Sequence, residues 1–250
     1  MVAAHAWGVR LVLAKMSATF CLLLRICDTQ GTEGELDTIV CVGGSSTAGG
    51  GPGVGANQSY PIGLERRLAA APVPLPQRVE VLNMAHGTTN TMYAVMNFDS
   101  LIPFNRRVPL VVWEYAINDS HDHIVDQPWS LMMLLRQMAR HPSKPLIVIV
   151  LLWDSPFHLP EPTLPSRYPK QSVYSQIKDL VTQATAIGLV AGVVDMAAWV
   201  IADCQTRIAT GTDKPRKKDY VADGHHMNAK LHAVAAEKLE AIVVRAQECK

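Results

Sequence analysis

The sequence predicts an α/β fold, a three-layer α/β/α sandwich built around a mainly parallel sheet of about five strands. From about residue 37 onward, short apolar runs alternate with longer amphipathic ones, which is the pattern of successive β-α-β units. The run 146–152 is apolar throughout, as expected of a strand covered on both faces. No linker divides the 250 residues, so we expect one domain over 36–250.

Each element can be assigned in chain order. The strands are expected at 37–43, 78–82, 108–114, 146–152 and 189–194. Apolar residues at i, i+3 and i+4 predict helices at 60–68, 91–101, 129–140 and 172–187, and an Ala-rich helix follows from 228 to about 246. Ligands of parallel sheets bind outside the carboxyl ends of the strands. We therefore expect four polar residues that follow strand ends to gather at one rim: Ser45, Asn83, Asn118 and Asp154.

Residues 1–35 are expected to form an N-terminal extension outside the domain. The apolar stretch 16–24 lies between Lys15 and Arg25 and meets part of the secretory-signal pattern. It is too short to cross a bilayer without burying one of these charges, and no later segment has the required length, so no stable membrane span is expected. Two locations stay open: secreted or endomembrane if the stretch is a signal or anchor, and cytoplasmic if it is an added helix.

Charge and cysteine content exclude several classes of protein. Lys plus Arg number 23 against 22 acidic residues, which argues against a dedicated nucleic-acid surface. The basic run 214–218 is interpreted as a solvated loop. Five scattered cysteines without a CxxC pair do not indicate a zinc ribbon or a disulfide framework, and Cys41 is expected in the core. The Pro-rich segment 154–169 fits a lid over the rim or a passive connection equally well.

Three polar motifs contain the residue types that acyl transfer requires. Ser45 lies in the Gly-bounded turn GGSSTAGG and is a candidate nucleophile, with Ser46 as its neighbour. In DGHH, Asp223 precedes His226 by three residues, a spacing that lets a carboxylate orient an imidazole base. Asn118 follows an apolar strand in WEYAIND and offers an amide donor for an oxyanion.

Four blocks in chain order resemble the SGNH, or GDSL-type, esterase and lipase superfamily. They are GGSSTAGG, NMAHGTTN, YAINDS and DGHHMN, and they cover the chain from about Asp37 to its end. The resemblance implies a flavodoxin-like sandwich of the SGNH hydrolase type that needs no cofactor. It also implies roles for single residues: Ser45, Asp223 and His226 as the catalytic triad, and Ser45, Gly87 and Asn118 as the oxyanion hole.

The resemblance implies a serine esterase that cleaves a carboxylic ester through an acyl-enzyme. The expected substrate is an acetyl or short acyl ester, on a carbohydrate, a lipid or another small molecule; the oligomeric state stays open. Three departures from the family pattern are visible: Gly44 replaces the usual Asp, Ala116 replaces the usual Gly, and Thr88 competes with Gly87 for the position in block two. They leave two alternatives open, a non-catalytic domain that binds a glycan or protein, and an acyltransferase with the same triad.

A metal centre is the chemical rival of this interpretation. Acidic and histidine side chains are dense after the third strand, and Asp223, His225 and His226 add further candidates. No cysteine or third histidine stands at a recognised ligand spacing, so no metal is expected and His225 is interpreted as an exposed neighbour. The remaining members of the cluster are Asp119, His121, Asp122, His123 and Asp126.

Overall fold

The computed structural model describes residues 37–71, 79–121, 127–153, 173–186, 188, 190–211 and 213–247. The expected N-terminal extension lies outside these residues. So does the Pro-rich segment that follows residue 153, together with Asp154, and so do Asp122, His123 and Asp126. The predictions made for them are therefore not tested by the structure.

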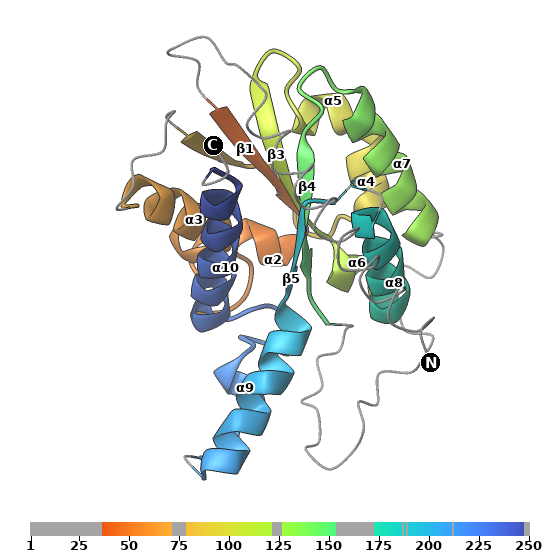
Figure 1. Ribbon diagram of the computed structural model, residues 1–250. Coiled ribbons are helices and arrows are strands. Elements are labelled where there is room, and N and C mark those ends of the chain that lie inside the picture. The colour runs from red at the N-terminus through yellow and green to blue at the C-terminus, as the bar shows by residue number, and fades with distance from the viewer. Residues whose placement is uncertain are drawn as a thin grey trace, which may run out of the picture.

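The core of the fold is a five-stranded, wholly parallel sheet in the order β2-β1-β3-β4-β5 (Figure 1). Every residue of β4 is buried, as its uniformly apolar sequence predicts. The predicted α/β sandwich is thus confirmed. The strands are β1 (Asp37–Gly43), β2 (Val79–Asn83), β3 (Arg107–Glu114), β4 (Leu146–Leu151) and β5 (Gly192–Asp195).

Helices cover both faces of the sheet (Figure 1). On one face, α3 (Tyr60–Ala69) packs against α10 (Ala229–Gln247), and on the other α7 (Gln127–Arg140) packs between α4 (Thr91–Met96) and α8 (Val173–Ala186). The described helices include none that is both long and apolar enough to cross a membrane. Shorter elements are α2 (Ser45–Ala48), α5 (Phe98–Leu101), α6 (Ala116–His121), η1 (Ala56–Gln58) and η2 (Lys217–Asp219).

The structure differs from the sequence-based elements in three places. The helix predicted over 91–101 breaks at Asn97, whose side-chain amide donates to the carbonyl of Tyr93 at 2.9 Å and so ends α4. Strand β5 begins at Gly192 rather than at 189. A helix that was not predicted, α9 (Met196–Thr210), begins at Asp195, whose carboxylate accepts the N–H of Ala198, and ends at the left-handed Gly211.

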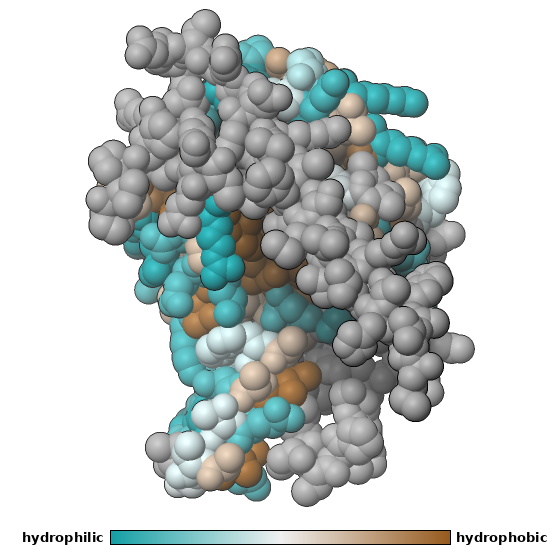
Figure 2. Space-filling model, viewed as in Figure 1, coloured by the Kyte–Doolittle hydropathy of each residue, from teal (hydrophilic) through white to brown (hydrophobic). Residues whose placement is uncertain are grey.

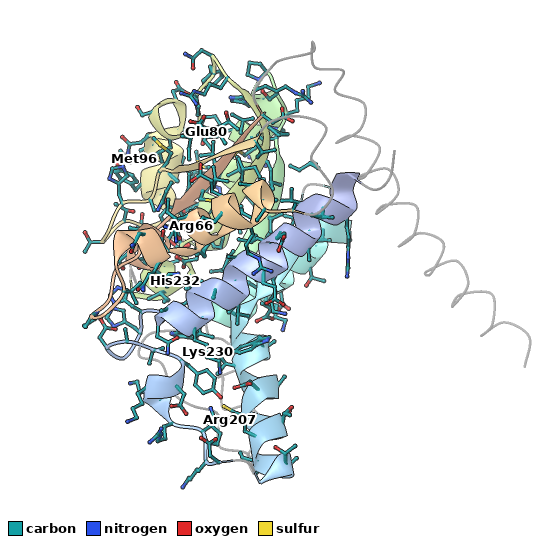
Figure 3. All side chains as sticks on the ribbon, turned by 90° about the vertical axis from the view of Figure 1, so that its left-hand side faces the viewer. Arg66, Glu80, Met96, Arg207, Lys230 and His232 are labelled. Atoms are coloured by element: carbon teal, nitrogen blue, oxygen red, sulfur yellow. The ribbon has the colours of Figure 1, made fainter. Side chains whose placement is uncertain are left out.

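Helix α9 projects from the end of the domain (Figure 1). Its projecting part carries both hydrophilic and hydrophobic residues, and Ile208 is 41% exposed (Figure 2). Arg207 ties this helix to the following segment through ion pairs with Asp213 and Asp219 (Figure 3). The lysines of the basic run 214–218 are exposed, in agreement with the predicted solvated loop.

Candidate active site

Ser45 lies at the point where β1 turns into α2. Strand β1 ends at Gly43 and Ser45 opens the short helix, so the backbone N–H of Ser45 belongs to the first turn, where it has no intrahelical partner. The N–H of Gly44 donates to the carbonyl of Glu114 at 3.1 Å, which fixes this turn to the end of β3. Ser46, the neighbouring hydroxyl, is 3% exposed and does not line the pocket that Ser45 lines.

Asp223 and His226 lie on a small loop that precedes α10. An antiparallel bridge between Val221 and Met227 closes this loop, and the N–H of Ala222 donates to the carbonyl of His226 at 2.9 Å. The carboxylate of Asp223 folds back over the loop. Its Oδ1 accepts the N–H of His226 at 3.1 Å and the N–H of His225 at 3.3 Å.

The fold brings Ser45 to His226 across 181 residues of sequence. Ser45 Oγ lies 2.6 Å from Nε2 of His226, and Nδ1 of the same ring lies 2.7 Å from Oδ2 of Asp223. A neutral imidazole has one N–H and one lone pair. With the N–H directed to the carboxylate, the lone pair at Nε2 accepts the hydroxyl proton of Ser45.

The charge of Asp223 supports this arrangement. Partial burial raises its pKa, but the hydrogen bonds from the His226 ring and from the two backbone N–H groups outweigh burial and lower the pKa to about 2. The carboxylate is therefore ionised at neutral pH.

The glycine-rich loop that contains Gly51 packs directly against the loop 221–227, called the base loop below, which carries Asp223 and His226. Gly51 has φ +118, and a Cβ there would lie 3.1 Å from Cβ of His226 and 3.2 Å from Cβ of Ala222. Both the backbone conformation and the close approach favour glycine. The glycines after the serine turn therefore let two distant segments close on each other.

Asn118 reaches the same site from α6. Its Nδ2 donates to the carbonyl of Thr89, and because the amide has two N–H groups, one remains for the pocket that Asn118 lines. The neighbouring Asp119 is 2% exposed and accepts both the N–H (2.9 Å) and the hydroxyl (2.6 Å) of Thr91. Asp119 thus holds the end of the loop between β2 and α4, where Thr91 begins α4.

The loop between β2 and α4 contains Gly87 and Thr88, the two residues predicted as candidates for a backbone N–H donor to the oxyanion. Gly87 lies beside the nucleophile, since a Cβ there would be 3.9 Å from Cβ of Ser45. Thr88 lines the pocket and has φ 61, a conformation that β-branched residues rarely adopt. The loop is therefore held in a strained turn next to Ser45, and Gly87 stays the predicted donor.

The structure gives a reason for the unusual Gly44. A Cβ at this position would lie 2.7 Å from Nδ2 and 2.9 Å from Cγ of Asn118, inside van der Waals contact. The absence of a side chain at Gly44 is therefore what allows Asn118 to lie against the nucleophile turn. Ala116, the other departure, is 1% exposed at the start of α6.

The sequence resemblance assigns Asn118 to the oxyanion hole, and a methyl group at position 44 would displace its amide. On that assignment we expect Gly44→Ala to lower kcat by about 10²–10³-fold with little change in KM. Ester hydrolysis by Asn118→Ala and by the double variant provides the check. The double variant should be no slower than Asn118→Ala, since both changes remove the same donor. Additive losses would show that Gly44 acts on something other than Asn118.

A pocket of about 400 Å³ opens over these groups. Seven of its eight lining residues carry a hydroxyl, amide or imidazole group, and one is aliphatic. The lining residues are Ser45, Thr88, Thr89, Asn90, Ile117, Asn118, His225 and His226. Asn83, which was expected at this rim, instead uses its side-chain amide to donate to the carbonyl of Thr47 at 3.1 Å and does not line the pocket.

Sequence reasoning missed a buried polar network that begins at Thr47, two residues after Ser45. The hydroxyl of Thr47 donates to Oε2 of Glu114 at 3.0 Å and lies 3.0 Å from the hydroxyl of Tyr60, and the backbone N–H of Tyr60 donates to Nδ1 of His232 at 3.2 Å. All four residues are at most 1% exposed. The signal in the sequence was an acidic residue at the end of an apolar strand, in VPLVVWE.

Burial shifts the titration of this network. Desolvation raises the pKa of Glu114 to about 8, although the hydrogen bond from Thr47 opposes the shift. Desolvation also lowers the pKa of His232, which lies on α10 beside α3, to about 4 (Figure 3). Both groups are therefore largely neutral at neutral pH. Trp113 and Tyr115, which flank Glu114, are fully buried.

Trp153 anchors the base loop to the sheet. Its side chain is fully buried just beyond β4, and Nε1 donates to the carbonyl of His225 at 3.0 Å. Among the described residues, the histidine and acidic side chains that could hold a metal are Asp223, His225 and His226. The carboxylate of Asp119 is instead hydrogen-bonded to Thr91 at the start of α4.

Comparisons with known proteins identify the fold. Neither protein-family models nor curated protein sequences give a match. Solved structures do: a two-domain esterase active on acetylated mannans aligns at 15% identity and a TM-score of 0.60, covering 86% of this chain and 50% of that one. TesA aligns at 16% identity and 0.59 over 84% and 99% of the two chains. Axe2, an acetylxylan esterase from Geobacillus stearothermophilus, aligns at 14% and 0.57 over 85% and 94%.

These neighbours include GDSL-type lipolytic proteins, for example a GDSL-like lipase of Parabacteroides merdae at 12% identity and a TM-score of 0.57. The chain spans about half the length of the two-domain mannan esterase and nearly the full length of the other neighbours named. The protein therefore has the SGNH hydrolase fold, and the resemblance found in the sequence is confirmed at the level of the fold.

Proposed function

We propose that the protein is a serine esterase that hydrolyses a carboxylic ester through an acyl-enzyme. The observation that carries the proposal is the continuous hydrogen-bond line from Ser45 Oγ through the His226 ring to Asp223, with contacts of 2.6 and 2.7 Å. A serine hydroxyl is a weak nucleophile unless a positioned base takes its proton. This line supplies that base together with the carboxylate that orients it.

The proposed reaction has two halves. Ser45 Oγ attacks the ester carbonyl while Nε2 of His226 takes the hydroxyl proton, and the same nitrogen then gives that proton to the departing alcohol. A water molecule, activated by His226, cleaves the acyl-enzyme. The negative charge that develops on the carbonyl oxygen is stabilised by the backbone N–H groups of Ser45 and Gly87 and by the side chain of Asn118.

The character of the pocket supports a short or polar acyl group. Threonine and asparagine make up half of its lining residues, and Ile117 is its aliphatic member. A pocket of about 400 Å³ with one aliphatic side chain offers a long alkyl chain little apolar surface to bury, so lengthening the chain should add little binding free energy. Acetylated glycans are the substrates named for two of the structural neighbours, and an acetyl ester on a carbohydrate fits this wall.

A fluorophosphonate probe tests the proposal directly. The probe should label the wild type and not Ser45→Ala, because it phosphonylates only an activated serine. Ser46→Ala is the matched control, since this neighbouring hydroxyl is buried, and it should retain labelling. A folded wild type that is not labelled would contradict the proposal and favour a binding domain.

Substrate length is tested with p-nitrophenyl esters of increasing acyl chain. We expect kcat/KM to be highest for the acetate and to fall as the chain grows. Adding an alcohol to the same assay separates the hydrolase from the acyltransferase alternative, because a transferase would pass the acyl group to the alcohol faster than to water. A maximum at long chains would contradict the short-acyl proposal.

A further inference from the structure

A second imidazole stands beside the proposed base. The rings of His225 and His226 have centroids 3.9 Å apart. Nδ1 of His226 is 2.7 Å from Oδ2 of Asp223, and Nδ1 of His225 is 3.8 Å from Oδ1 of the same carboxylate. One carboxylate is thus flanked by two imidazole nitrogens, with one ligand atom from each residue within 4.8 Å of the others.

The backbone of His225 is held in place although its side chain is 39% exposed. Its N–H donates to Asp223 Oδ1 at 3.3 Å and its carbonyl accepts the indole N–H of the buried Trp153 at 3.0 Å. Because both its backbone N–H and its backbone carbonyl are hydrogen-bonded, His225 can move mainly by rotation of its side chain. His225 therefore presents its ring to the carboxylate while staying accessible from the pocket that it lines.

Two imidazoles and a carboxylate are a donor set that Zn²⁺ favours, with bonds of roughly 2.0–2.2 Å. Tetrahedral coordination at that length places ligand atoms roughly 3.3 Å apart. Nδ1 of His226 is 2.7 Å from Oδ2 of Asp223, Nδ1 of His225 is 3.8 Å from Oδ1, and one ligand atom from each residue lies within 4.8 Å of the others, so small side-chain rotations bring the three atoms into that range. We propose that Asp223, His225 and His226 form an inhibitory Zn²⁺ site that takes the base out of action. This inference rests on the proposed function, because it assigns a regulation to the same site.

The inhibition follows from the two nitrogens of one ring. A Zn²⁺ ion bound at Nδ1 of His226 uses the lone pair of that atom and replaces the proton shared with Asp223. The single proton of the neutral imidazole then moves to Nε2. Nε2 lies 2.6 Å from Ser45 Oγ, and once it carries the proton it can no longer accept the one from the serine. No proton is lost or gained in this step, and chelation of the ion reverses it.

The same chemistry sets the selectivity among metals. Imidazole nitrogen suits Zn²⁺ and Cu²⁺, whereas Mg²⁺ and Ca²⁺ prefer oxygen ligands. Mg²⁺ and Ca²⁺ should therefore leave the activity unchanged at concentrations at which Zn²⁺ inhibits. Binding of the ion should depend on His225. Without it, only Asp223 and His226 remain as ligands, and these two are already hydrogen-bonded to each other.

Titration calorimetry of the full chain with ZnCl₂ at neutral pH tests the site independently of catalysis. The wild type should bind one Zn²⁺ at a site that His225→Asn weakens at least tenfold, and Ser45→Ala should leave that affinity unchanged. His86→Asn is the matched control, since His86 is exposed and packs against Tyr93 outside this cluster. Equal affinity of the wild type and His225→Asn, or no binding at all, would overturn the proposal.

The rate of fluorophosphonate labelling tests the consequence. Zn²⁺ should slow labelling of the wild type at least tenfold, EDTA should restore it, and His225→Asn should lose most of this sensitivity relative to its own metal-free rate. Zn²⁺ bound without slower labelling would refute inhibition. If the wild type is not labelled even without metal, the proposed esterase fails instead, and calorimetry alone then decides whether the ion binds.

Discussion

Replacing Asp223 by Asn is expected to lower kcat by about 10⁴-fold, as the corresponding change does in serine proteases. The structure gives the reason. Oδ1 of Asp223 accepts two backbone N–H groups, those of His225 and His226, so the oxygen of the new amide should stay on them. The NH₂ group then faces Nδ1 of His226. Nδ1 must become an acceptor, which leaves the proton on Nε2 and prevents it from taking the proton of Ser45.

Hydrolysis of p-nitrophenyl acetate measures this effect, with Asp99→Asn as a control at an exposed aspartate on α5. The control should retain the wild-type rate. KM should change little in Asp223→Asn, because Asp223 orients the base and does not line the pocket. A loss in kcat of less than tenfold would mean that His226 does not depend on Asp223 for its orientation.

Replacing Glu114 by Gln is expected to change the pH dependence of stability by a few kcal/mol. Burial raises the pKa of Glu114 from an ordinary value near 4.5 to about 8, so the folded state holds a proton that the unfolded state releases. The stability contributed by the neutral carboxyl group is fully present below about pH 4.5 and is lost as pH rises through about 8. Each unit of pKa difference corresponds to about 1.4 kcal/mol.

Glutamine has the shape of the neutral acid and can accept the hydrogen bond from Thr47, but it does not titrate. Glu114→Gln should therefore keep its free energy of unfolding at alkaline pH, where the wild type loses it.

The effect of His232 on the pH dependence of stability has the opposite sign. Its pKa is lowered to about 4, so the stability that it contributes is present above about pH 6.5 and is lost as pH falls through 4.

Urea denaturation of both proteins from about pH 5 to about pH 9 isolates Glu114, since His232 and the other groups contribute equally to both curves and cancel in the difference. The difference should grow in favour of Glu114→Gln as pH rises. A constant difference across this range would show that Glu114 is ionised in the folded protein.

Much of the site was predictable because its residues stand at strand ends. Ser45 and Asn118 each follow an apolar run, and parallel strands direct their carboxyl ends to one edge of the sheet. The spacing of Asp223 and His226 within one short loop is a local property, so it could be recognised without the fold. The same reasoning was wrong for Asn83, because a strand end fixes where the backbone lies but not where the side chain points.

Contacts between distant segments could not be predicted. The hydrogen bonds between Thr47 and Glu114 and the contact of Gly44 with Asn118 join residues that are far apart in the chain. Helix α9 was also missed, although its Asp195 cap and terminal Gly211 were visible in the sequence. The break at Asn97 depended on a side-chain hydrogen bond that competes with the helix.

The amino-acid order alone determined the class of fold and the chemical types present, because the alternation of apolar runs and the flanking polar residues are local patterns. Only the tertiary structure decided which of these groups meet. It brought the hydroxyl of Ser45 to the ring of His226, 181 residues away, and it placed the side chain of Asn118 against Gly44. Long-range packing sets such distances, and no local pattern encodes them.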